Sequence, residues 1–524
     1  MSTTVIRDTP QRSESTAMRW FWPIHLILLS LVLIGQLATG TSLEFSLWMS
    51  LLWLQFGVVF SRTKGVASVL GCCLLLFFIQ HVGAAMVMKV LHWQPADEIM
   101  YVPIQTLQVY NVGFLGLIFG SFFLDFLRIS KAKPLIVLKP TEDRLFILAV
   151  ILLVISAVRW YAVNRFGVAD EGGLYVGGVI GPLRQLHFIQ YLPIVLGTAY
   201  AIVKSNGKKW LHWTNIISVL ISIAGGIIFA VRQEMVWAIV TLVLSAHMFG
   251  FQFKFKQYGL IIGLALFFQL VLSPYALYAR NEVRTGTQTE RLTTMAKVFT
   301  EVITEPEKFR KKEVEDAQVV TEDERRTHYF REASNLKERH ALINWVSSVI
   351  YRTNLEGYDG GGRIYHGWKM VIPRFANNPD KPVIGTANDL GHKAIGLVGP
   401  TDFTTQITLG FIADAFNAYG WWCVFLTAFL TLVTYGLFIS FLFGDGLSRN
   451  ILSLGIVYQA TQVFAERTIA AQIVFLFQDL IVYAIFSALI VFFANTMTRR
   501  TREAPYAYER QRGMGRVVSP DTRP

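Results

Sequence analysis

The sequence predicts an all-α integral membrane protein with about twelve transmembrane helices and one large extracytoplasmic helical loop. Hydrophobic residues make up 53% of the 524-residue chain, and its mean hydropathy is +0.43. Charged residues make up only 16%, whereas soluble domains carry about 25%. Apolar runs recur along the chain at roughly the 20-residue length that a helix needs to cross a bilayer.

Twelve apolar segments are expected to cross the membrane, although the eleventh is short and polar. The segments are Phe21–Gly40, Leu43–Ser61, Gly65–Val90, Tyr101–Leu127, Leu145–Val163, Pro182–Val203, Leu211–Val231, Met235–Phe251, Tyr258–Tyr278, Trp421–Phe443, Ile451–Ala465 and Ala470–Met497. Nine of them form a bundle over residues 21–278, and three form a second bundle over residues 421–497. An N-terminal segment (1–20), the extracytoplasmic loop (279–420) and a basic tail (498–524) complete the chain.

The distribution of Lys and Arg predicts the orientation. Basic residues gather in the connections after the second, fourth, sixth and eighth expected spans, and in both terminal segments. Because basic connections stay on the cytoplasmic side, we expect both termini to be cytoplasmic. Much of the net charge of +12 lies in these segments, where it suits anionic lipid headgroups and requires no nucleic acid. The three cysteines have neither metal-site nor disulfide spacing.

The first half of the long loop is dense in charge. Between Arg280 and His340 it carries thirteen Lys or Arg and thirteen Asp or Glu. Opposite charges at helical spacing predict two solvated helices, Glu290–Phe309 and Glu313–Trp345. We expect this charged arm to be a folded extracytoplasmic cap or a flexible arm.

The second half of the loop has a different composition. The glycine-rich run Tyr358–Gly362 predicts a flexible hinge. The run Ile364–Arg374 that follows is amphipathic and aromatic, which suits a segment that lies at the membrane interface or dips in from outside.

Arginines far apart in the sequence are expected to converge at the outer ends of the spans. They are Arg159, Arg165, Arg184, Arg232, Arg374 and Arg467. An arginine at the end of an apolar span is costly unless it has a partner, and positive charge is disfavoured on the outer side. The planar guanidinium fits phosphate oxygens, so the pattern predicts an anion site with phosphate as its natural ligand.

Simpler interpretations exist for some of these residues. Arg165 and Arg184 fit side chains that extend to lipid headgroups, and Arg467 next to Glu466 fits an interfacial ion pair. His81 and His187 fit packed polar residues. The chain has no Asp-x-Asp cluster, zinc-ligand spacing or glycine-rich phosphate loop. We therefore expect neither a metal nor another cofactor.

Three stretches resemble the bacterial oligosaccharide repeat-unit polymerase family (Wzy-type, O-antigen-polymerase-like). The first is Val231-Arg232, which closes one apolar span and opens the next. The second combines Ile372-Pro373-Arg374 with Asp380-Lys381-Pro382 in the large loop. The third is the glycine-bounded run from Gly410 to Gly420 that leads into the next span.

The resemblance implies a GT-C-like, metal-independent glycosyltransferase in the bacterial inner membrane. Such an enzyme joins polyprenyl-diphosphate-linked oligosaccharides into a surface polysaccharide or exopolysaccharide at the outer face. The implied partners are the lipid-linked substrate, membrane lipid, and a chain-length regulator and flippase of the same pathway. A glycan ligase with the same donor, a transporter or flippase for the lipid-linked sugar, and a structural subunit of an envelope-assembly complex remain alternatives.

The same resemblance implies roles for individual residues. Arg159, Arg232 and Arg374 would hold the diphosphate, and further substrate-binding candidates are Arg165, Arg184, Arg467 and Lys381. The candidates for the base that takes the proton of the acceptor hydroxyl are His366, Asp389 and Glu466. Tyr358, Tyr365 and Trp368 would stack on sugar rings or, equally, anchor the chain at the interface.

Overall fold

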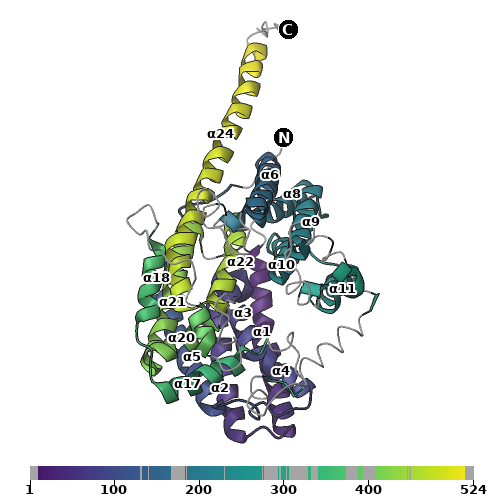
Figure 1. The fold of residues 1–524 in the computed structure, drawn as a ribbon. Coiled ribbons are helices and arrows are strands. Elements are labelled where there is room, and N and C mark those ends of the chain that lie inside the picture. Colours follow the sequence, from purple (N-terminus) through teal and green to yellow (C-terminus); the bar gives the residue numbers. More distant parts are fainter. Residues whose placement is uncertain are drawn as a thin grey trace, which may run out of the picture.

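The computed structural model describes most of the chain. The described residues are 10–129, 133–139, 141–166, 183, 186–228, 231–273, 275–276, 293, 297–302, 304–305, 328–331, 340–372, 387–393, 409–444, 446–447 and 450–513. The regular elements within these ranges are all helical (Figure 1). The predicted all-α class is confirmed.

Within these described ranges, eight helical segments are long and apolar enough to cross a membrane. They are Arg19–Ala38, Leu43–Ala67, Val69–Leu91, Pro103–Phe126, Glu142–Val163, Leu186–Lys204, Trp421–Phe443 and Ile469–Thr496. The chain is therefore a multi-pass membrane protein. The four other predicted spans correspond to shorter helices of 13 to 17 residues, so the structure does not confirm the count of twelve. These helices are α9 (Trp213–Ile228), α10 (Arg232–Met248), α11 (Phe255–Phe267) and α22 (Ile451–Glu466).

The first bundle contains α1 (Pro10–Ala38), α2 (Leu43–Arg62), α3 (Val69–Phe78), α4 (Ala84–Leu91) and α5 (Pro103–Phe126). Helix α21 (Trp421–Phe443) returns from far along the chain to pack on α5. Small residues allow this close contact: a Cβ at Gly116 would lie 2.4 Å from the backbone oxygen of Phe425. Small residues promote close helix packing in membranes, where helix association gains little from the hydrophobic effect.

The second bundle contains α6 (Glu142–Phe166), α8 (Leu192–Lys204), α9 and α10. Helix α22 lies between the two bundles, because it packs against α3 on one side and against α8 and α10 on the other. Helix α24 (Leu480–Gly513) begins in the bundle and its C-terminal part extends beyond it (Figure 1). The junction around α22 is therefore the place where distant helices meet.

Three π-helical turns interrupt the long helices. They are η2 (Ile79–Gly83), η5 (Phe268–Leu272) and η6 (Phe475–Asp479). A π-turn changes which side chains face a neighbouring helix, and such turns occur often at functional sites. The first contributes Gln80 and His81 to the junction described below, and Ser273, which follows the second, accepts a hydrogen bond from Arg232.

The charged arm is not solvated throughout. Val298 and Val302 are 3% and 6% exposed and pack in a cluster with Met235 at the start of α10. Tyr329 and Phe330 are also buried, and Tyr329 lies over the ammonium group of Lys89 at 4.4 Å. The expectation of purely solvated helices is therefore wrong for these residues, which fix the arm to both bundles.

The glycine-rich run predicted as a flexible hinge is held by backbone hydrogen bonds. The amides of Asp359 and Gly360 donate to the carbonyl oxygens of Asn417 and Ala418, at 2.9 and 3.1 Å. Gly360 has a φ of +75°, a conformation that glycine adopts at little cost. The glycines here permit a tight turn against the chain that precedes α21, and the hinge interpretation is wrong.

Replacing Gly116 with Ala is expected to lower stability, because the new methyl group meets backbone atoms of α21 that cannot move aside. The cost should be about 1–3 kcal/mol. Gly259→Ala is a matched control, since a Cβ there has no neighbour within 4 Å and alanine favours the helix. Thermal unfolding in detergent should show a lower Tm for Gly116→Ala alone. Equal Tm values would contradict the packing of α5 on α21.

Candidate functional site

The last residue of α22 carries a carboxylate that amide groups from two other helices hold. Glu466 Oε1 accepts a hydrogen bond from Gln80 Nε2 at 2.8 Å, and Oε2 accepts one from Gln233 Nε2 at 3.3 Å. Gln233 is held in turn by Gln462, whose Nε2 donates to Gln233 Oε1 at 2.5 Å. Neutral donors thus orient Glu466 from η2 and α10 without neutralising its charge.

The first turn of α10 connects this carboxylate to two predicted arginines. Consecutive residues of a helix point about 100° apart, so Arg232, Gln233 and Glu234 reach three different neighbours. Arg232 Nη1 donates to Ser273 Oγ at 3.2 Å, and Gln233 reaches Glu466. Glu234 provides the negative charge that faces Arg159 on α6.

Arg159 is the most deeply buried of the predicted arginines within the described residues. Its exposed fraction is 8%, although it lies within an apolar helix that is long enough to cross the membrane. Nε donates to the carbonyl oxygen of Leu183 at 2.8 Å. A buried arginine needs such partners, and here a carboxylate and a backbone carbonyl supply them.

Arg467 does not pair with the carboxylate next to it in sequence. Among the described residues, the half-buried guanidinium of Arg467 forms no hydrogen bond or ion pair. The interpretation of Glu466 and Arg467 as an interfacial ion pair is therefore wrong. The Tyr458 hydroxyl interacts electrostatically with both charges. The four residues Arg159, Arg232, Glu466 and Arg467, together with the polar residues that link them, are called the junction cluster below.

The backbone of the junction cluster is fixed by His81. Its Nε2 lies 2.8 Å from the carbonyl oxygen of Ala465 and its Nδ1 lies 2.6 Å from the Tyr110 hydroxyl. Because a carbonyl can only accept, Nε2 carries the hydrogen and Nδ1 accepts from Tyr110. Two consecutive residues of η2 thus bond to the C-terminal end of α22: Gln80 to the side chain of Glu466, and His81 to the carbonyl oxygen of Ala465. His81 is a packed polar residue, as the sequence suggested.

The aromatic candidates lie elsewhere. Tyr365, His366 and Trp368 belong to α18 (Gly362–Val371), which packs against α23 (Ile469–Val474). Figure 1 draws α18 and α10 on opposite sides of α22. Glu466 is therefore held between η2 and α10, Arg159 faces the same helix through Glu234, and Arg232 turns to Ser273. The α18 candidates lie against α23, the helix that follows Arg467. Five predicted residues lie wholly or by their side chains outside the described part of the chain: Arg165, Arg184, Arg374, Lys381 and Asp389.

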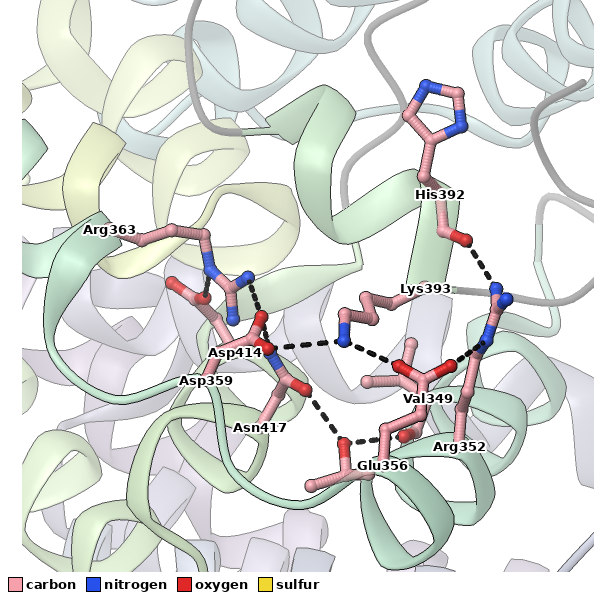
Figure 2. A network of polar contacts seen from close by, with 10 residues as sticks. Val349, Arg352, Glu356, Asp359, Arg363, His392, Lys393, Asp414 and Asn417 are labelled. Carbon is pink, nitrogen blue, oxygen red and sulfur yellow. Dashed lines mark hydrogen bonds and ion pairs between the residues drawn. The ribbon is translucent and has the colours of Figure 1, made fainter. Parts of the chain in front are cut away.

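A second polar network, which the sequence analysis missed, surrounds α20 (Gly410–Tyr419). Asp414 is 1% exposed, and its Oδ1 accepts from Arg363 Nε at 2.8 Å (Figure 2). Its Oδ2 accepts from the backbone amide of Ile469 at 2.9 Å, which caps the start of α23. Arg363 Nη1 also donates to Asp359 Oδ2 at 2.7 Å. A charged residue inside the apolar run Phe411–Phe416 was the sequence signal that a cation had to lie nearby.

The network continues through alternating charges to α17 (Leu342–Glu356) and α19 (Ala387–Lys393), as Figure 2 shows. Lys393 Nζ lies 3.1 Å from Asp359 and 2.6 Å from Glu356. The hydrogen bond from Lys393 is the main cause of a lowered pKa for Glu356. Burial opposes ionisation of Asp359, but hydrogen bonds from Asn417, Arg363 and Lys393 outweigh it and lower the pKa of Asp359.

Histidine, cysteine, aspartate and glutamate side chains do not gather in groups of three or more that could hold a metal ion anywhere in the described ranges. Neither a scan against protein-family models nor searches of curated proteins and solved structures give a match for this chain. The geometry of the junction cluster is therefore the basis for any functional assignment.

Asp414→Ala should lower the free energy of unfolding by about 3–5 kcal/mol, because it leaves Arg363 buried without its main counterion. Glu98→Ala is the control, since Glu98 pairs with Arg331 on the surface, where both side chains are more than a third exposed. Unfolding in detergent should show a large loss for Asp414→Ala and little change for Glu98→Ala. Similar losses would contradict the structural role of the buried pair.

The ion pairs of Glu356 should stabilise the protein only while the carboxylate is ionised. Since its pKa is lowered in the folded state, this contribution is present above the ordinary glutamate pKa of about 4.3 and is lost as pH falls further. Wild type should therefore be more stable than Glu356→Gln at pH 7, and the difference should vanish in acid. Thermal unfolding of both proteins between about pH 3 and pH 7 measures it. A difference that is independent of pH would refute the pairing.

Proposed function

We propose that this protein is a polytopic glycosyltransferase that joins polyprenyl-diphosphate-linked oligosaccharide repeat units at the outer face of the bacterial inner membrane. In this proposal the chain crosses the membrane twelve times in a GT-C-like arrangement. The single observation that supports it most is the junction cluster, where the half-buried guanidinium of Arg467, which has no partner among the described residues, adjoins a carboxylate held by neutral amides. Arg159 and Arg232 lie on helices that reach the same junction.

The arginines suit the donor substrate. The described cluster contains three guanidinium groups (Arg159, Arg232, Arg467) and the two carboxylates of Glu234 and Glu466, so it carries one net positive charge. A lipid diphosphate brings negative charge to the boundary between membrane and water. Guanidinium groups bind phosphate oxygens through paired hydrogen bonds and stay ionised. They also stabilise the charge that develops when the diphosphate leaves.

Glu466 is the base candidate that fits this arrangement best. In the proposed step, the acceptor hydroxyl oxygen forms a bond to the anomeric carbon of the donor sugar, and the bond from that carbon to the diphosphate breaks. The electron pair leaves on the diphosphate, and the hydroxyl proton passes to Glu466. Amide donors keep this carboxylate oriented, as a general base requires. Of the other two base candidates, His366 lies on α18, which packs against α23, and the side chain of Asp389 is outside the described residues.

Arg467→Lys and Arg232→Lys should reduce glycan extension by about 10²-fold or more, because lysine keeps the charge but loses the two-pronged donor geometry. Arg331→Lys, in the surface pair with Glu98, is the control and should retain activity. The assay incubates each purified protein with lipid-linked repeat units in detergent and resolves the product lengths. Normal chain lengths in both variants of the junction cluster would rule out a role in diphosphate binding. Transfer to a different acceptor without extension would identify a ligase.

Glu466→Gln should reduce kcat by about 10²–10⁴-fold while the lipid-linked donor still binds, because the amide has the same shape but cannot accept the proton. Glu356→Gln is the matched control at a carboxylate outside the junction cluster. Single-turnover rates and donor binding measure the two effects separately. Unchanged kcat in Glu466→Gln would assign the base to another residue.

A further inference from the structure

The two amides that hold Glu466 differ in how their oxygen atoms are bonded. Gln233 donates through Nε2 to Glu466, and its Oε1 accepts a hydrogen bond from Gln462 Nε2 at 2.5 Å. Gln80 also donates through Nε2, at 2.8 Å, but its Oε1 is buried and has no hydrogen-bond partner among the described residues. The Gln233 amide is therefore held from both sides, whereas the Gln80 amide is held only by Glu466.

The hydrogen bonds on the Gln233 side have a fixed direction while Glu466 is ionised. An ionised carboxylate can only accept hydrogen bonds, so Gln233 must turn its NH2 group toward Glu466 and its oxygen toward Gln462. Gln462 and Glu466 are four residues apart on α22, a spacing that places both on one helix face. Gln462 is thus the residue that fixes the orientation of the Gln233 amide.

A protonated Glu466 would need different partners. A carboxyl oxygen that has gained a proton becomes a donor and requires an acceptor, and a buried donor without one is costly. Gln233 can offer its oxygen only by losing the hydrogen bond from Gln462. The Gln80 amide has no such bond to lose, because turning it over replaces its NH2 group by an oxygen that no described residue engages.

We propose that Glu466 receives the acceptor proton on Oε1, that the Gln80 amide turns over to accept the resulting O–H, and that Gln462 holds Gln233 as a permanent donor. This inference rests on the proposed glycosyl transfer, which delivers the proton: it leaves the acceptor hydroxyl and ends on Glu466 Oε1. Gln80 and Gln462 are then positioning residues with different tasks. Gln80 bonds to Glu466 in both protonation states, whereas Gln233, held by Gln462, favours the ionised state.

The dependence of single-turnover extension rates on pH tests the proposal with full-length protein and lipid-linked repeat units in detergent. In Gln462→Leu the Gln233 amide can turn its oxygen to Glu466, so the ionised state loses its permanent donor. The acidic limb of the rate profile should then move to higher pH by about one unit, with the plateau rate retained. Charged and titratable groups near Glu466 are unchanged in this variant: Arg159, Arg232 and Glu234, Tyr458 and Arg467, and His81.

Gln80→Leu should have the opposite pattern. The plateau rate should fall about tenfold or more, because the proton gained by Glu466 has no acceptor and the carboxylate is held less precisely. The acidic limb should stay at the wild-type pH, since Gln80 bonds to both protonation states and its loss affects both. Gln80→Met, with an unbranched apolar side chain of similar length, replaces this variant if it fails to fold.

Gln105→Leu is the matched control, because Gln105 and Asn354 form another pair of amides that exchange hydrogen bonds outside the junction cluster. It should reproduce the wild-type profile. A displaced acidic limb in Gln80→Leu, or an undisplaced limb in Gln462→Leu, would overturn this inference and leave Glu466 as the base. Absence of extension by the wild-type protein, or an unchanged rate in Glu466→Gln, would instead overturn the proposed role of Glu466 and this inference with it.

Discussion

A charged group inside an apolar helical bundle must have a partner, and this constraint explains the arrangement of both polar regions. Asp414 is almost fully buried and is bonded by Arg363 and by a backbone amide. Arg159 is almost as deeply buried and is bonded by a backbone carbonyl and faced by Glu234. In each case the partner comes from a different helix, so satisfying the charge also fixes how the helices pack.

The short connection between α22 and α23 links the two regions. Glu466 ends α22 and faces the junction cluster, whereas the amide of Ile469, which begins α23, donates to Asp414 on the other side. Thr468 caps α23 through its hydroxyl, which accepts from the amide of Ala471. Because Arg363 of α18 bonds to Asp414, a movement of α18 would shift Asp414. Asp414 would in turn shift the backbone at Ile469, three residues from Glu466. The two regions thus share one turn of the chain.

The sequence predicted the features that depend on composition and charge, and it missed those that depend on packing. The helical class and the multi-pass membrane character follow from composition and from the cost of placing charge in lipid, whereas a common site for Arg159, Arg232 and Arg467 stays a prediction. The sequence analysis missed Gln80 and Gln233, because a neutral amide side chain needs no charged partner. Its role becomes visible only when its neighbours in the structure are known. The separation of α18 from α10 could not be predicted, since it depends on which helices are adjacent. The glycine run at 360–362 fits both a hinge and a tight turn, and only its hydrogen-bond partners distinguish them.

The partners of Glu466 also favour a site that binds a charged ligand over a purely structural cluster. Arginine 467 is adjacent in sequence and would neutralise Glu466 most simply, yet the carboxylate is held by two glutamines and the guanidinium is unpaired among the described residues. A half-buried guanidinium without a counterion is unfavourable in a structural cluster, because desolvation is then uncompensated. The arrangement becomes favourable when an anion binds beside Arg467. Glu466 does not compete for the same guanidinium, so in the proposed reaction one turn offers a positive group to the leaving phosphate and a negative group to the attacking hydroxyl.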